Sequence, residues 1–482
     1  MTDLPSLGAI GQVGSYRVGD SVTGIAYERR GRHVFVGQRR NRGSRDALIL
    51  IGKMIERGAV QNYYDSNVWL DVEHPHVIFI SGKRGSGKSY DLGVIAEGLA
   101  LSRPSAVSTK PVSFTSVFFD TQNQFWTLGL ELDENIDEDR EQLAALARWR
   151  LSPERVPNVV LLRPRGTAPL HLGEQEFSIT SSDLSVDDWC GLFELDRFTP
   201  MGHLLRTLHS LVTIDGWTDA DTGSSVDATP DFVPADLLRC LVTAVEVRAV
   251  HEAVRDGLQW RLESIAATQL FSAHGLSAAD VLRSGQTTVV LLREIEDATK
   301  AVVVSVLCRR MFSLMGAHHT RRRAARRFGT TFEDDELPDG AWVLVDEAHV
   351  VAPTSRMTAA RPTLVEFVKR GRDSGLSLVL ATQQPSALDP AILSQVDINI
   401  SHRLVFDADV SAAVARFPSR LPRNVRSGEQ DISAPDDLIR SLGDGTAVLG
   451  DSESPRGLLV AVRPRVTPHG GREPSLLDAG TA

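Results

Sequence analysis

The chain has 482 residues, of which 42% are hydrophobic and 24% charged, and its formal net charge at pH 7 is -10. The length allows two to four domains or one large domain with insertions, and the composition is near the average for globular proteins. The acidic balance argues against a protein that coats nucleic acid with its whole surface. The charge still allows a ring that presents basic residues only along its pore. The sequence contains no apolar run of about 18 to 20 residues and no signal peptide pattern, so we expect no membrane partner. The three scattered cysteines form no metal-binding spacing and indicate reduced thiols in a cytoplasmic protein.

In chain order, residues 1–70 come first and hold short apolar and β-branched runs broken by glycine, which predicts a small β-rich N-terminal region. From residue 71 the pattern changes to short apolar runs that alternate with helix-like segments. Such alternation predicts an α/β domain with a parallel central sheet, here over residues 71–465. The runs predicted to form its strands are residues 77–80, 116–119, 159–162, 288–292, 342–345 and 377–381.

Two further segments interrupt or follow this domain. Residues 183–275 carry leucines at helical spacing, with Pro234 suited to a first helical turn, and predict a helical insertion. Residues 466–482 are rich in proline and glycine and predict a flexible C-terminal tail.

The most specific motif follows the first predicted strand of the α/β domain. Residues 82–89 read GKRGSGKS and fit the pattern G-x-x-x-x-G-K-[ST] between a strand and a helix. In such a loop, backbone N–H groups and a helix N-terminus face one anion, the lysine neutralises phosphate charge and the hydroxyl holds Mg²⁺. We therefore expect ATP and Mg²⁺ to bind here, with the nucleotide contacts made by Gly82, Arg84, Gly85, Ser86, Gly87, Lys88, Ser89 and Tyr90.

Two carboxylates end a later predicted strand, 342–345. We expect Asp346 to hold Mg²⁺ together with Ser89, and Glu347 to orient and deprotonate the water that attacks the γ-phosphate. Polar residues also follow strand 377–381, at the edge where ligands of parallel sheets gather. We assign Gln383 to the contact with the γ-phosphate and the water, with Gln384 as the alternative.

A basic segment precedes that strand. Arg370 or Arg372, at a predicted helix end, could reach the γ-phosphate of a neighbouring subunit. The alternative is that these cations simply favour the C-terminal end of the helix dipole.

The series GKRGSGKS, RSGQTTVVLL, VLVDEAH and KRGRDSGLSLVLATQQPSALDPAILSQVDINISHRL resembles the HerA branch of the FtsK/HerA ATPases over roughly residues 70–465. The resemblance implies a RecA-like P-loop ATPase that forms a homo-hexamer and moves double-stranded DNA. It also implies an effector protein, a nuclease or another enzyme, in DNA processing or anti-phage defence. Residues 1–70 would then be a shortened form of the family's N-terminal barrel. The alternative function is an ATP-dependent hexameric scaffold that assembles and activates a partner enzyme without pumping DNA.

Overall fold

The protein is described from a computed structural model that covers residues 4–7, 16–18, 28–37, 47–58, 64–331, 337–427 and 429–471. Within this part of the chain, one sheet of 14 strands forms the centre of the molecule. Its first half is parallel, in the order β10 (Gln175–Phe177), β9 (Val159–Pro164), β15 (Thr287–Leu291), β8 (Thr115–Asp120), β16 (Ala341–Val345), β17 (Leu376–Thr382), β7 (Val77–Ser81) and β18 (Ile398–Ser401).

The parallel strands are apolar along their whole length because helices cover both faces of the sheet. On one face, Ile78 and Ile80 of β7 pack with α1 (Lys88–Ala100). On the other face, Val77 and Phe79 belong to the core that includes α8 (Asp297–Phe328) and α10 (Ala360–Arg370). The prediction of an α/β fold with a parallel central sheet is therefore confirmed.

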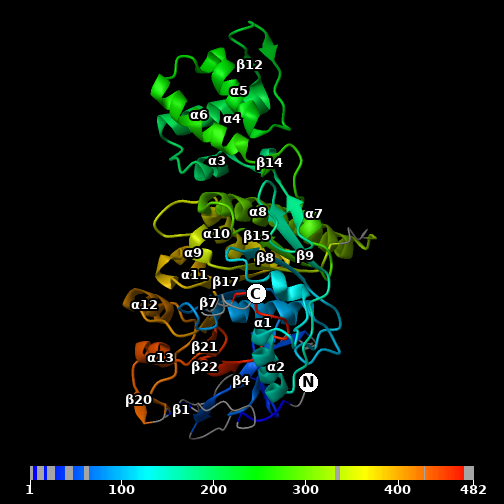
Figure 1. Cartoon of the computed structure of the whole chain (residues 1–482), viewed down its shortest axis with the longest axis vertical. Helices are drawn as coiled ribbons and strands as arrows, with labels where there is room; N and C mark the ends of the chain where they lie inside the picture. Colours follow the sequence, from blue (N-terminus) through cyan, green and yellow to red (C-terminus); the bar gives the residue numbers. More distant parts are fainter. Residues whose placement is uncertain are drawn as a thin grey trace.

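The sheet continues past β18 into a mainly antiparallel half (Figure 1). Its strands are β21 (Thr446–Asp451), β22 (Leu458–Val462), β4 (Leu48–Met54), β6 (Asn67–Asp71), β3 (His33–Val36) and β2 (Glu28–Arg30). A second sheet of four strands contains β20 (Gln430–Ile432), β19 (Val425–Ser427), β1 (Tyr16–Val18) and β5 (Glu56–Gly58). The remaining helices of this body are α2 (Asp137–Trp149), α7 (Ala278–Val281), α9 (Ala348–Val351), α11 (Pro390–Leu393), α12 (Asp407–Ala415) and α13 (Pro435–Ser441).

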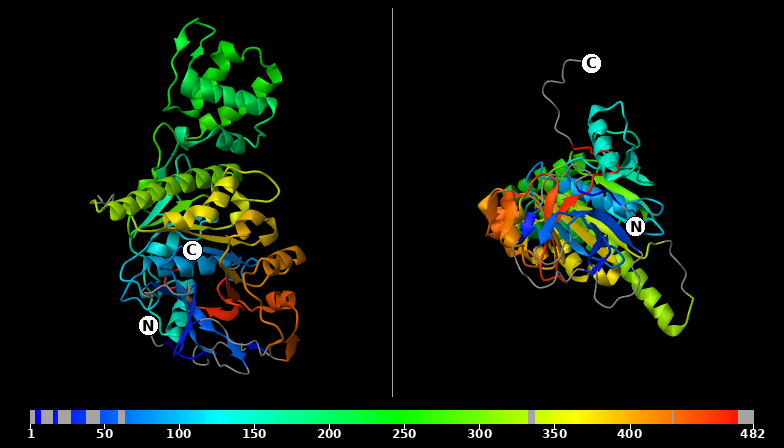
Figure 2. Two further views of the ribbon diagram at one scale, coloured as in Figure 1. Left: turned by 180° about the vertical axis from the view of Figure 1, so that it is seen from behind. Right: turned by 90° about the horizontal axis from the view of Figure 1, so that it is seen from below.

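The N-terminal strands are not separate from the ATPase sheet. β4 pairs antiparallel with β22, for example Met54 with Val460, so early and late segments of the chain lie side by side in blue and red (Figure 2). This differs from the predicted division at residue 70. Without β22, one edge of β4 would be exposed, with its backbone N–H and C=O groups unpaired.

The predicted helical insertion forms a lobe of its own beyond α8 (Figure 1). A short parallel pair, β11 (Ile179–Thr180) and β14 (Phe271–Ser272), brings the two ends of the insertion together at its base. The lobe contains α3 (Val186–Leu192), α4 (Pro200–Ser210), α5 (Pro234–Thr243), α6 (Glu252–Ala267) and a small hairpin of β12 (Trp217–Thr218) and β13 (Ser225–Val226). Pro234 begins α5, where its missing N–H costs no helical hydrogen bond.

One prediction about a terminal segment needs correction, and one apolar helix bears on the expectation of no membrane partner. By length and composition alone, α8 is long and apolar enough to cross a membrane. Its apolar 18-residue stretch is nevertheless 61% buried inside the structure. The predicted tail begins too early, because Val466 and Thr467 are fully buried. The backbone N–H groups of both residues donate to the buried carboxylate of Glu97, so residues 466–471 belong to the folded body. Residues 472–482 of the predicted tail lie outside the described residues.

Candidate active site

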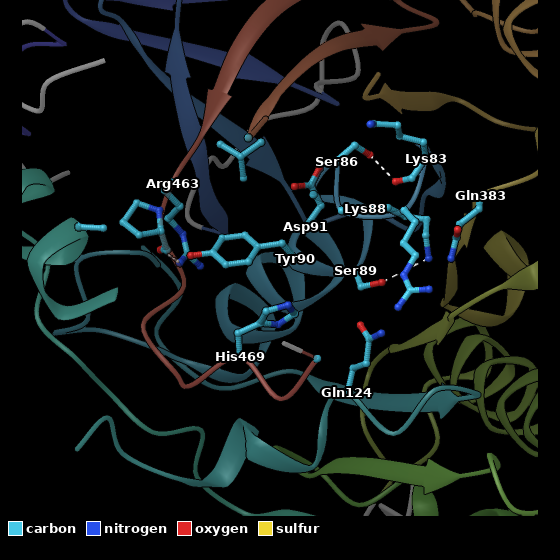
Figure 3. A pocket seen from close by; sticks show the side chains of 18 of the residues that line it. Lys83, Ser86, Lys88, Ser89, Tyr90, Asp91, Gln124, Gln383, Arg463 and His469 are labelled. Atoms are coloured by element: carbon cyan, nitrogen blue, oxygen red, sulfur yellow. Dashed lines mark hydrogen bonds between the residues drawn. The ribbon is translucent and has the colours of Figure 1, made fainter. Parts of the chain in front are cut away.

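The phosphate loop connects β7 to α1 at the carboxyl edge of the parallel strands, and Figure 3 shows the cavity beside it. Gly85 and Gly87 have φ angles of 75° and 118°, which residues other than glycine rarely adopt. A Cβ atom on Gly82 would lie 2.8 Å from the Cβ of His402, and one on Gly87 would lie 3.1 Å from its ring. The loop therefore takes its shape both from glycine conformations and from contact with a buried histidine.

That histidine was not singled out in the sequence. His402 is fully buried, with Nδ1 at 2.9 Å from the carbonyl oxygen of Thr446 and Nε2 at 2.8 Å from the Asp91 carboxylate. Both neighbours are acceptors, so both ring nitrogens must carry hydrogen and the ring is an imidazolium. Burial disfavours this charge, but the Asp91 carboxylate and the two hydrogen bonds outweigh it and raise the pKa of His402. An imidazolium paired with the Asp91 carboxylate thus lies directly beneath the phosphate loop, with its ring against Gly87.

The structure brings together the lysine and the two acids predicted to act on the phosphate. Lys88 Nζ donates to Asp346 Oδ1 at 3.0 Å, to Glu347 Oε1 at 2.7 Å and to Ser89 Oγ at 3.2 Å. β17 lies between β7, which carries the loop, and β16, which ends at the acids, so the ends of all three parallel strands meet at one edge of the sheet.

Asp346 offers one test of whether Mg²⁺ fits here. Its Oδ2 atom is buried and has no hydrogen-bond partner among the described residues. Lys88 Nζ contacts both this carboxylate and the Ser89 hydroxyl, and carboxylate and hydroxyl oxygens are ligands that Mg²⁺ prefers. Ser89 and Asp346 therefore fit the metal-binding roles predicted for them.

Glu347 is held in an unusual backbone conformation, with φ 47° and ψ 53°. Such left-handed geometry is uncommon for a residue other than glycine and is found at functional sites. Gln383 donates to the two carboxylate oxygens, from Nε2 to Oε1 at 2.6 Å and from its backbone N to Oε2 at 3.1 Å. Gln384 is exposed and its backbone N–H donates to Thr382, so the structure favours Gln383 over the alternative.

A second histidine, His349, also contacts this glutamate. Its Nδ1 lies 3.3 Å from Glu347 Oε2 and 2.9 Å from Thr382 Oγ1. Burial would raise the pKa of Glu347, but the hydrogen bond with His349 and the charge and hydrogen bond of Lys88 outweigh it and lower this pKa to about 2. Glu347 is therefore an ionised carboxylate, as a general base must be. The only signal for His349 in the sequence was its position two residues after that glutamate.

The two candidate arginines lie away from the phosphate loop of their own chain. Arg372 pairs with Asp397, whose carboxylate accepts from the backbone N of Val77 at the amino end of β7. The phosphate loop follows the opposite, carboxyl end of β7, so the length of this strand separates Arg372 from the loop. Arg370 ends α10, pairs with Glu366 at 2.8 Å and is largely exposed. Both arginines therefore belong to the amino edge of the sheet, whereas the phosphate loop lies at its carboxyl edge.

The remaining predicted contacts differ in their surroundings. Ser86 Oγ donates to the Lys83 carbonyl at 2.7 Å and steadies the loop, whereas Arg84 is exposed at its tip. The Tyr90 hydroxyl accepts from the backbone N of Arg465 at 2.7 Å. All three line a cavity of about 1000 Å³.

Comparison with known proteins gives two family matches. The model described as "Helicase HerA, central domain" matches residues 49–311, and the one described as "Zonular occludens toxin (Zot)" matches residues 277–405. A probable helicase of Methanocaldococcus jannaschii is 24% identical over 171 residues, which are 35% of this chain and 28% of that protein. The DNA double-strand break repair helicase HerA of Pyrococcus furiosus is 30% identical over 112 residues, or 23% of this chain and 17% of its own length. The chain thus spans less than a third of these relatives.

Solved structures of low sequence identity also match. VirB4 of Thermoanaerobacter pseudethanolicus has a TM-score of 0.49 and 13% identity, over 86% of this chain and 96% of that one. The plasmid coupling protein TrwB in complex with ADP and Mg²⁺ has a TM-score of 0.46 and 13% identity, over 84% and 89% of the two chains. The HerA model covers more than half of the 482 residues, which confirms the resemblance seen in the motifs: the chain belongs to the HerA helicase family.

Proposed function

We propose that the protein is a cytoplasmic, ring-forming motor that hydrolyses ATP and moves double-stranded DNA. The observation that supports ATP hydrolysis best is the group formed by Lys88, Asp346, Glu347 and Gln383. A lysine from the phosphate loop, a metal carboxylate, an ionised base and a polar sensor meet there within hydrogen-bonding distance. Transfer of a phosphoryl group from ATP to water requires these four side-chain functions.

Each side chain has a definite task in this proposal. Lys88, which here pairs with both acids, turns to the β- and γ-phosphates when ATP binds, and Glu347 is then released to accept a proton from the attacking water. Gln383 keeps Glu347 in position and reports the presence of the γ-phosphate along β17. Ser89 and Asp346 would hold Mg²⁺, which when bound supplies positive charge to the phosphate oxygens.

The ring follows from the position of the arginines. Because Arg370 and Arg372 lie at the edge of the sheet away from their own chain's phosphate loop, a head-to-tail neighbour would receive one of them at its γ-phosphate. Such a heterologous contact closes into a ring or continues as a filament. Membership of the HerA family supports closure, and we propose a homo-hexamer.

The uneven distribution of charge along the chain indicates where DNA and a protein partner would bind. Residues 183–275 contain 15 Asp and Glu against six Arg, a net charge of -9 out of the -10 of the whole chain. The insertion lobe would therefore repel DNA, and we propose that DNA passes along the nearly neutral remainder. The acidic lobe also supports the alternative function, a scaffold that engages an effector enzyme such as a nuclease, in DNA processing or in defence against phage.

The test is the ATPase rate with and without linear duplex DNA, and with Lys88→Ala as the inactive control. Strong stimulation that falls steeply with salt and depends little on sequence supports the motor, because pore contacts would be made to phosphates. Stimulation only by a protein partner supports the scaffold. Normal turnover in Lys88→Ala would remove the claim of ATP hydrolysis at this loop.

A further inference from the structure

The long helix α8 extends beyond the body that it covers. As far as His319 it packs against the turn before β17, where a Cβ on Gly375 would lie 2.5 Å from Nε2 of that histidine. It ends nine residues later at Phe328, which at 1.5 Å per residue is about 14 Å further on. Figure 2 shows this end of α8 standing clear of the other elements. We call residues 320–328 the arm.

The arm is basic and has an exposed aromatic tip. It contains no acid and five arginines, which are Arg321, Arg322, Arg323, Arg326 and Arg327. Arginines four positions apart on a helix repel one another, as 322 and 326 or 323 and 327 do here. Arg322 pairs with Asp339, and the four acids at 333–336 lie outside the described residues. Phe328 is 78% exposed, so a partner that covers it should be apolar as well as acidic.

A hollow of that character lies between the insertion lobe and the helices next to it. Its volume is about 1010 Å³, and its apolar lining includes Phe198, Phe312 and Met357. Five carboxylates line it against three arginine side chains, which gives a net charge of -2. Two of these acids, Asp187 and Glu194, form ion pairs within the hollow and still have side chains that are each 63% exposed. The hollow therefore favours a cationic partner with an apolar tip.

The arm and the hollow lie toward opposite edges of the parallel sheet. Because α8 connects two parallel strands, β15 and β16, it begins at the carboxyl edge and its arm projects beyond the amino edge. The hollow is lined by the first turns of α10 and by residues 356–359, which follow the carboxyl end of β16. In Figure 1 the arm accordingly projects on the side away from α9 and α10. The two surfaces can therefore meet only between different copies of the chain.

We propose that the arm of one subunit docks into the hollow of a second copy, with Phe328 against the apolar lining and the arginines beside the acids. The proposal rests on the head-to-tail ring of the proposed function. In such a ring the amino edge, which holds Arg370 and Arg372, faces the carboxyl edge of the neighbour, so the contact that delivers an arginine also delivers the arm. A DNA backbone would pair with the arginines but would give Phe328 no apolar cover. Burial of this ring and complementary charge both favour the second copy.

Surface variants of the full chain test the contact. Phe328→Ala removes the tip of the arm, and Met357→Lys places a like charge at the rim of the hollow. Both side chains are largely exposed, so neither change should unfold the protein. Leu172→Ala changes another exposed apolar side chain, outside the arm and the hollow, and is the matched control. Assembled mass is measured by sedimentation velocity with Mg-ATP over a range of protein concentrations.

We expect Phe328→Ala and Met357→Lys to need at least about tenfold more protein to assemble than the wild type or the control. Mixing the two variants should produce dimers at concentrations where neither variant alone forms them. The Met357→Lys chain then supplies an intact arm, and the Phe328→Ala chain supplies an intact hollow. Wild-type assembly in both variants, a mixture no larger than its components, or a wild type that stays monomeric would overturn the docking.

Arg326→Glu separates this contact from DNA binding and should also weaken assembly. If that variant lost affinity for duplex DNA while its assembled mass stayed normal, the arm would belong to DNA and the proposal would be wrong. Failure of the proposed motor would be seen differently. The variants would then assemble as expected here, which supports the contact, while the ATPase rate of the wild type would ignore duplex DNA.

Discussion

Removal of the charge of Glu97 should destabilise the whole protein. This carboxylate is fully buried and accepts from the guanidinium groups of Arg463 at 2.8 Å and Arg465 at 3.2 Å, which are also fully buried. In Glu97→Gln the two cations would keep their burial and lose their counter-charge. Breaking a buried ion pair in this way costs about 3–5 kcal/mol.

The structure places the expected loss at the lower end of that range. Arg463 also donates to the carbonyls of Leu50, Val94 and Pro464, at 2.9 to 3.0 Å, and these bonds survive the change. We therefore expect the free energy of unfolding to fall by about 3 kcal/mol at neutral pH. The folded-state pKa of Glu97 is lowered, because the two arginines and the hydrogen bonds outweigh burial. Its contribution is thus present above the unfolded value of 4.5 and is lost as pH falls through the folded pKa, so wild type and variant should converge in acid.

Urea denaturation followed by tryptophan fluorescence measures the difference. The control is Asp431→Asn, which breaks the exposed pair with Arg426 and should cost less than about 1 kcal/mol. If Glu97→Gln lost no more stability than this control, the buried ion-pair cluster would not hold residues 465–467 against α1.

Three predictions concern the site itself, which Figure 3 shows from close by. Glu347→Gln should still bind Mg-ATP and lose about 10²-fold or more in turnover, and a near-normal rate in a phosphate-release assay would move the base role elsewhere. ATP affinity should fall as pH rises through the raised pKa of His402, because the imidazolium charge under the loop is then lost. In His402→Gln the ATP affinity should be low already at neutral pH and should vary little with pH. A wild-type pH profile of ATP affinity in that variant would contradict this role of His402. Arg370→Ala or Arg372→Ala should bind ATP but hydrolyse it poorly, and mixing with Lys88→Ala subunits should restore part of the rate; a monomer with full ATPase activity would exclude an arginine supplied by a neighbour.

What could be predicted from the sequence depended on how local the signal was. β7, β16 and β17 were predictable because strands buried on both faces are apolar throughout, and their ends bring Lys88, Glu347 and Gln383 to one edge. His402 was not, because its partner Asp91 is 311 residues away and a single histidine has no spacing pattern. The burial of Thr467 was missed for the same reason, since its partner Glu97 is 370 residues earlier in the chain. The Pro- and Gly-rich composition around it suggested a tail instead.

The pairing of β4 with β22 has a consequence for how a cell must make this protein. Lys53 pairs with Ala461, so β4 leaves the ribosome about 400 residues before its partner. At about 5 to 20 residues per second, that edge waits roughly 20 to 80 s in an unfinished chain. Throughout this interval an apolar strand with unpaired backbone groups can associate with other nascent chains. We expect the protein to depend on chaperones during synthesis, and its nucleotide pocket to be completed only when residues near 470 have emerged.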